Sequence, residues 1–99
     1  MEVNLPSTLN KIGVHAFASC ESLEEIIIPA SVEHIEQLCF DGCINLKSVV
    51  FSGDTPGYIE SHSFTCCTSL EYVKLPSKLE GVGAGAFSYC TSLKELQLP

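Results

Sequence analysis

The sequence predicts a repeat solenoid, in which the chain winds into stacked coils with parallel β-strands along one face. The main observation is a short motif that returns four times, centred on a phenylalanine and followed three residues later by a cysteine. The four phenylalanines are Phe17, Phe40, Phe64 and Phe87, so that their spacings are 23, 24 and 23 residues. A period in this range is typical of units that each pack on their neighbours rather than around one closed core.

Length and composition support one folded domain of this kind. The chain has 99 residues, of which 45% are hydrophobic and 17% are charged, and a chain of this composition can bury a core. We expect a single array of about four repeats, near residues 6–28, 29–51, 52–75 and 76–98. Both ends stop at the same point of the pattern without a polar capping unit, so we expect the array to be a fragment of a longer protein.

The first element expected in each coil is a short parallel strand. Apolar and polar residues alternate over its last three positions, as they do in a half-buried strand. The pattern occurs at Leu23 to Ile28, Leu46 to Phe51, Leu70 to Leu75 and Leu93 to Leu98. Pro29, Pro76 and Pro99 follow three of these segments, as Pro6 follows Leu5, and proline ends a strand because it has no amide hydrogen.

A second apolar pair in each unit predicts a short extended stretch on the opposite side of the coil. The pairs are Leu9 and Ile12, Val32 and Ile35, and Leu79 and Val82. The third unit breaks this pattern, because its segment 52–59 is one residue longer and rich in turn formers. We expect this segment to bulge outward as a surface loop.

The phenylalanine motif forms the remaining part of each coil. A small residue precedes each phenylalanine, which suits a close approach of neighbouring backbones, and the segment is too short for more than a single helical turn. We expect the four rings to stack into a continuous aromatic row along the axis. Core packing explains these rings without a functional role.

The repeated unit resembles the BspA-like, or treponemal-type, leucine-rich repeat. The consensus is Leu-Pro-x-x-Leu-x-x-Ile-x-x-x-Ala-Phe-x-x-Cys-x-Ser-Leu-x-x-Leu-x-Leu, which residues 5–28 and 75–98 follow most closely. The resemblance implies a right-handed solenoid from surface-exposed or secreted proteins of host-associated bacteria and some protozoa, used in adhesion to host proteins and other cells. The chain departs from such proteins in showing no export signal, anchor or capping unit.

The six cysteines allow two interpretations. Cys20, Cys43, Cys67 and Cys90 form one inward-pointing column, where reduced thiols serve as small apolar side chains. Neighbouring coils are close enough for disulfides, but parallel side chains would strain such bonds, so we favour thiols and keep disulfides as the alternative. Cys66 falls in a column of mixed polarity and is the thiol that we expect to be reactive.

No enzyme, cofactor or metal site emerges from the sequence. His15 and His62 share a column two coils apart, and His34 belongs to another column, so no zinc spacing is present. A pair of Cys66 and His62 lacks an orienting group and an oxyanion site.

Charge and hydropathy exclude two partner classes. The net charge is −7 with no arginine, which disfavours nucleic acid, and no apolar stretch is long enough for insertion into a membrane.

The outward side of the strands is the most regular surface expected. One column contains Glu25, Ser48, Tyr72 and Glu95, and the next contains Ile27, Val50, Lys74 and Gln97. Ile27, Val50 and Tyr72 would form a small apolar patch with a charged rim, which favours a partner-binding surface, although single exposed aliphatics are common on strands.

Two functions remain open at this stage. The first is a non-catalytic module for protein–protein interaction and adhesion, located on a cell surface or secreted as the resemblance implies. The alternative is a passive structural spacer in a larger repeat protein. Uncapped ends would in addition leave the chain open to self-association.

Overall fold

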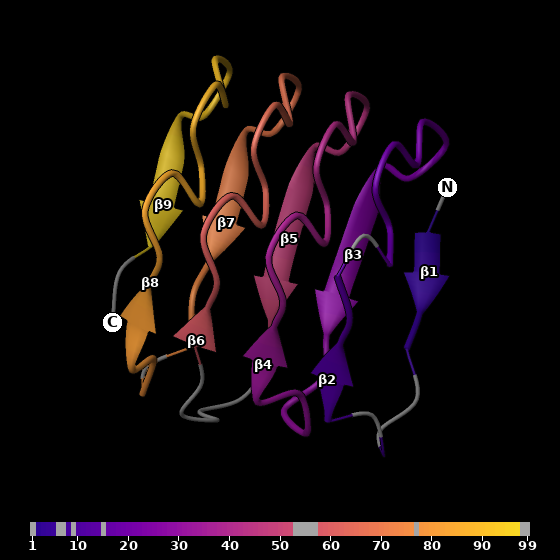
Figure 1. The fold of residues 1–99 in the computed structure, drawn as a ribbon. Helices are drawn as coiled ribbons and strands as arrows, with labels where there is room; N and C mark the ends of the chain where they lie inside the picture. Colours follow the sequence, from indigo (N-terminus) through magenta and orange to yellow (C-terminus); the bar gives the residue numbers. More distant parts are fainter. Residues whose placement is uncertain are drawn as a thin grey trace.

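The computed structural model describes residues 2–5, 8, 10–14, 16–52, 58–76 and 78–97, and these form two parallel sheets along one stack of coils (Figure 1). The larger sheet has the strand order β1-β3-β5-β7-β9 and the smaller one β2-β4-β6-β8. The larger sheet contains β1 (Glu2–Asn4), β3 (Glu25–Ile28), β5 (Ser48–Phe51), β7 (Tyr72–Lys74) and β9 (Glu95–Gln97). The smaller sheet contains β2 (Lys11–Ile12), β4 (His34–Ile35), β6 (Tyr58–Ile59) and β8 (Gly81–Val82). The chain thus alternates between the sheets, which confirms the solenoid.

The strands of the larger sheet follow the predicted alternation. In β3, Ile26 and Ile28 are fully buried, whereas Glu25 and Ile27 point outward. Parallel pairing carries this pattern to the next strand, with Ile26 opposite Val49. After β5, Ser52 stands where other units have proline, and its N–H donates to the carbonyl of Ile28 at 2.9 Å, a bond that proline could not make.

The smaller sheet confirms the second extended stretch and corrects one prediction. Residues 53–57 lie outside the described residues. The sequence predicted that Tyr58 and Ile59 belong to a bulging loop, and this prediction is wrong. They form β6, which pairs with β4 and β8, and Ile59 is buried. Phe51 pairs with Ile28 and Tyr58 pairs with His34, so the extra residue of the third unit lies between Phe51 and Tyr58. Predictions made for Pro6, Leu9, His15, Leu98 and Pro99 also lie outside the described residues.

The segments around the phenylalanines run as successive turns, where the sequence predicted single helical turns. No helix occurs among the residues that the structure describes. In the coils of Phe40, Phe64 and Phe87, two positions have positive φ, two residues before and two residues after the phenylalanine, as at His62 (φ 60°) and Cys66 (φ 62°). A right-handed helix requires negative φ at every residue, so these positions divide the segment into separate turns.

The phenylalanine rings stack in one row, as predicted. Neighbouring ring centroids are 5.1, 4.7 and 5.3 Å apart from Phe17 to Phe87, and the ring planes are parallel within 7°. Backbone hydrogen bonds join the same segments, since the N–H of Phe40 donates to the carbonyl of Ser63 at 2.7 Å and that of Phe64 to Ala86 at 2.8 Å. The small residue before each phenylalanine permits this approach, and Cys39 and Ser63 are fully buried there.

Candidate functional site

The candidate residues of the larger sheet lie in two straight columns. Pairing along β3, β5, β7 and β9 places Glu25, Ser48, Tyr72 and Glu95 in one column and Ile27, Val50, Lys74 and Gln97 in the other. The strands bring the columns together because one residue separates their members in each strand, so that both project from the same face. The side chains of Glu95 and Gln97 lie outside the description.

The exposure of these side chains varies along the face. Ile27 is 50% exposed, whereas Val50 and Tyr72 are half-buried beside it in the next two coils. Lys74 and Glu25 are exposed and supply charge at the border. In each of the inner strands β3, β5 and β7, a fully buried aliphatic residue lies between the two columns: Ile26, Val49 and Val73.

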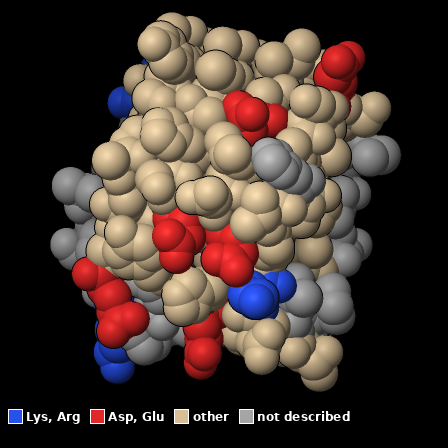
Figure 2. Space-filling view, viewed as in Figure 1, with Lys and Arg blue, Asp and Glu red and all other residues tan. Residues whose placement is uncertain are grey.

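The opposite, smaller sheet has an acidic surface that the sequence analysis did not single out. Figure 2 shows acidic side chains gathered over the lower part of the face in view, where β2, β4, β6 and β8 lie in Figure 1. The carboxylates flank the short strands at Glu33, Glu36, Glu60 and Glu80. Lys11 pairs with Glu36 at 3.6 Å. The repeat pattern could have indicated this acidic surface, because each acidic residue directly precedes or follows a strand of this sheet.

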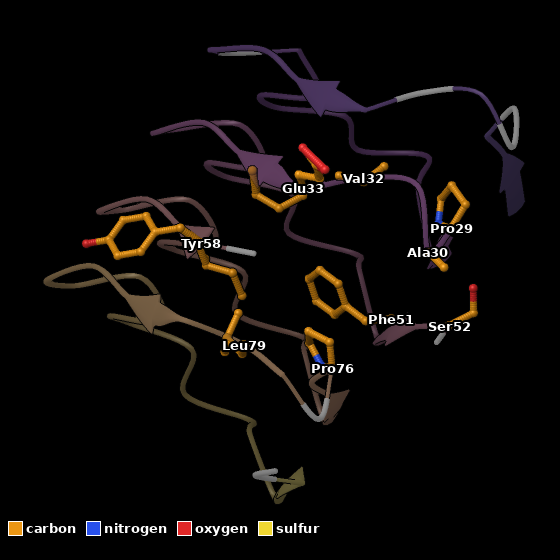
Figure 3. Close-up of a pocket in the computed structure, with 11 residues that line it drawn as sticks. Pro29, Ala30, Val32, Glu33, Phe51, Ser52, Tyr58, Pro76 and Leu79 are labelled. Carbon is orange, nitrogen blue, oxygen red and sulfur yellow. The ribbon is translucent and has the colours of Figure 1, made fainter. Parts of the chain in front are cut away.

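A pocket lies beside this acidic surface, where the two sheets approach each other after β3, β5 and β7. Its empty volume is about 300 Å³, open to solvent. Figure 3 shows Phe51, Pro76 and Leu79 around the opening, with Tyr58 and Glu33 at its border. The floor is apolar, since Ile35 and Ile59 beneath it are buried.

The six cysteines are free thiols, and three of them form a regular contact with the aromatic row. Each thiol donates to the carbonyl of the phenylalanine in the preceding coil: Cys43 to Phe17 at 3.0 Å, Cys67 to Phe40 at 3.3 Å and Cys90 to Phe64 at 3.2 Å. Hydrogen bonds with the neighbouring thiols of Cys43 and Cys90, together with burial, raise the pKa of Cys67. The hydrogen bonds with Cys67 lower the pKa of Cys43 and that of Cys90. The repeated contact with the phenylalanine carbonyls is what supports a structural role for these three thiols.

Cys39 is a second type of buried thiol. It precedes Phe40 in the small-residue column, and burial raises its pKa to about 12. Cys66, the thiol expected to be reactive, is half-buried, with the hydroxyl of Thr65 at 3.9 Å from its sulfur. Its role in reactivity stays a prediction.

The structure describes two of the three histidines, His34 and His62. Among the described residues, no group of three or more His, Cys, Asp or Glu side chains is placed to hold a metal ion. Within the same part of the chain, no helix is long and apolar enough to span a membrane. His62 lies instead over Gly85 of the next coil, where an added Cβ would come within 2.8 Å of Nε2.

Comparison with known proteins gives one match. The family described as "BspA type Leucine rich repeat region (6 copies)" matches residues 1–99. Neither the curated proteins nor the solved structures contain a match to the chain.

Proposed function

The chain belongs to the BspA-type leucine-rich repeat family, and we propose that it is a non-catalytic module for protein–protein interaction and adhesion, built as one array of four repeats. The surface proposed for the partner is the outward face of the larger sheet. We propose a location on a cell surface or outside the cell, in keeping with the family.

One observation carries the proposal: Ile27 is 50% exposed on β3, the second strand of the parallel sheet, with Val50 directly opposite it in the next strand. Exposure of this aliphatic pair to water is unfavourable. A partner that covers the pair gains about 25 cal/mol of binding free energy per Å² of apolar area removed from water. Tyr72 extends the patch on the adjoining column, and tyrosine is enriched among the residues that dominate interface energies.

The test replaces Ile27, Val50 and Tyr72 by serine together and measures retention on an array of host and bacterial surface proteins. We expect loss of retained partners with an unchanged far-UV circular dichroism spectrum, because the three side chains point away from the core. Serine preserves the backbone pairing of the strands.

A matched control removes exposed aliphatics elsewhere. Ile44 and Val14 are 44% and 51% exposed in turn segments, so the double variant Ile44→Ser and Val14→Ser removes similar apolar surface away from the sheet. It should retain the partners. Equal loss in both variants, or unchanged binding in the triple variant, would reject the larger sheet as the binding face.

A passive spacer is the second candidate function. The regular stacking of sheets and rings supports it, because stacked coils can separate other domains without binding a partner of their own. Capture of a specific partner by the isolated chain at about micromolar affinity would exclude the spacer.

Self-association belongs to the same proposal. Val82 is 44% exposed in β8, whereas its opposite residue Ile59 in β6 is 1% exposed. A second copy that packs on β8 would cover this aliphatic side chain. Sedimentation that does not change with concentration would argue against it.

A further inference from the structure

A row of alternating charge lies along one edge of the larger sheet, at the residue that directly precedes each of the strands β3, β5, β7 and β9. The members of this charged row are Glu24, Lys47, Glu71 and Lys94, and all four are exposed. Backbone hydrogen bonds keep them in line, because the N–H of each later member donates to the carbonyl of the member before it, at 2.7, 2.9 and 3.0 Å. The sign of the charge therefore changes from each coil to the next.

The charged row is open to a partner. Among the described residues, Lys47, Glu71 and Lys94 form no ion pair with one another, whereas Lys11 on the smaller sheet is paired with Glu36 at 3.6 Å. Opposite charges that meet across an interface fix its register and exclude partners with the wrong pattern. A row of defined signs thus favours a partner that carries the reverse sequence of signs.

Cations are concentrated on the larger sheet. Three of the five lysines of the chain, Lys47, Lys74 and Lys94, lie in its strands or directly before them. The smaller sheet is bordered instead by the carboxylates of Glu33, Glu36, Glu60 and Glu80. In a chain with a net charge of −7, the larger sheet is therefore the face on which two copies repel each other least.

The charged row is complementary to its own reverse. Consider two copies that meet through their larger sheets, related by a two-fold axis that runs parallel to the strands between β5 and β7. Each column then faces the same column of the other copy, with the order of the coils reversed. Lys47 lies opposite Glu71 of the second copy, and Glu24 lies opposite Lys94. Every charge of the row thus meets an opposite charge.

The same axis brings apolar side chains to the centre of the contact. Val50 lies on β5 and Tyr72 on β7, which are the two strands beside the axis, and both side chains are half-buried. Val50 of one copy would lie over β7 of the other, close to Tyr72. Sheets that pack face to face keep their strands aligned to within about 30°, as this arrangement requires.

From this symmetry we propose that the chain forms a two-fold symmetric dimer through the outward faces of its larger sheets, with the charged row setting the register. The inference rests on the proposed function, because it takes the same face as a binding surface and names a second copy of the chain as the partner. It is separate from the contact at Val82, which lies on the smaller sheet.

Sedimentation equilibrium of the parent chain is the first test. A contact between four short strands is at the small end of specific interfaces, so we expect a monomer at about 10 μM and a substantial dimer fraction at about 1 mM. A chain that is still monomeric at about 1 mM would overturn the inference.

Two variants test the charged row. The acidic-row variant combines Lys47→Glu with Lys94→Glu, and the basic-row variant combines Glu24→Lys with Glu71→Lys. Each places like charges opposite each other, so each should dimerise at least about tenfold more weakly than the parent. The basic-row variant has a smaller net charge than the parent, so general repulsion would not explain its loss. Mixed in equal amounts, the two variants should form a heterodimer with at least the affinity of the parent.

The matched control combines Lys11→Glu with Lys78→Glu, which changes the net charge as the acidic-row variant does, at exposed positions outside the larger sheet. It should dimerise like the parent, and far-UV circular dichroism should show the same fold in every variant. Equal loss in the control, unchanged dimerisation of both row variants, or a mixture that stays monomeric would overturn the inference.

The outcome also separates this inference from the proposed function. A monomeric parent chain whose serine variant of Ile27, Val50 and Tyr72 loses partners on the protein array would assign the face to a foreign protein, and only the dimer would be refuted. A dimer that depends on the charged row, with no change in array binding by the serine variant, would refute the proposed function alone.

Discussion

At the scale of single residues, a shared backbone conformation explains why equivalent positions of successive coils can contain side chains that have little in common. Ser19, Gly42, Cys66 and Tyr89 occupy the same point of successive coils, and all four have φ between 58° and 74°. Only one of them is glycine, although this conformation costs other residues about 1 kcal/mol. The mixed composition of the column reflects a shared backbone requirement that the turns impose.

The first prediction exchanges residues at this point. Tyr89 is 73% exposed, so Tyr89→Gly should relieve backbone strain with little loss of packing and raise the free energy of unfolding by up to about 1 kcal/mol. Gly42→Ala should lower it by a similar amount, because an added Cβ there meets no atom closer than the Ser19 hydroxyl at 3.6 Å and only the backbone penalty remains. Urea denaturation measures both. A lower stability for Tyr89→Gly would show that the tyrosine ring contributes more than its backbone costs.

The second prediction concerns Cys39, whose pKa is raised to about 12 by burial. A thiol in the unfolded chain titrates near about 8.5, so above that pH the unfolded state loses a proton that the folded state keeps. The contribution of Cys39 to stability is complete below this value and decreases as the pH rises toward 12. Urea unfolding at pH about 7 and about 10.5 should therefore show a larger loss for the parent chain than for Cys39→Ala.

The Cys39→Ala variant places at position 39 a residue that the chain already has at Ala86. It fills the corresponding position in another coil and is buried there, so alanine is compatible with the packing. If the two proteins lost the same free energy between the two pH values, the thiol of Cys39 would not be the cause.

At the scale of elements, the coils depend on two kinds of ladder that run along the same axis. The sheets join neighbouring strands, and the turn segments are joined by backbone bonds such as that from the Phe40 N–H to Ser63. The ring row and the thiol–carbonyl contacts lie between these ladders. Because every coil packs on the next in the same way, a residue inside the row has two neighbours and a residue at its end has fewer.

The third prediction follows from this difference. Phe64 is fully buried and stacks on Phe40 and Phe87, whereas Phe17 is half-buried and stacks on Phe40. Phe64→Ala should lower the free energy of unfolding by about 3–5 kcal/mol, and Phe17→Ala by clearly less. Chemical denaturation of the two variants under the same conditions tests this order. Equal losses would mean that the terminal ring is as well packed as the internal one.

At the scale of the whole molecule, the two sheets present different surfaces. The larger sheet combines exposed aliphatic and charged side chains in straight columns, and the smaller sheet is bordered by carboxylates around a pocket. The same winding produces both, since the chain visits each sheet once per coil. A change to an exposed side chain of one sheet is therefore expected to leave the surface of the other unaltered.

The columns of candidate residues could be predicted from the period alone. Once the phenylalanines set the register, Ile27 had to lie beside Val50, and the structure confirms this pairing. The pocket could not be found in this way, because it depends on how residues from three coils meet at the connection between the sheets. The error at Tyr58 has the same origin, since local turn formers suggested a loop where long-range pairing and burial of Ile59 favoured a strand.

The sequence by itself determined the solenoid, the inward columns and the family, because a repeat of constant length places equivalent side chains above one another. Only the tertiary structure decided where the extra residue of the third unit is absorbed, which residues adopt positive φ, and that an apolar space opens beside the carboxylates. Those features arise from contacts between neighbouring coils, and such contacts depend on the packing of several units at once rather than on the pattern within any one of them.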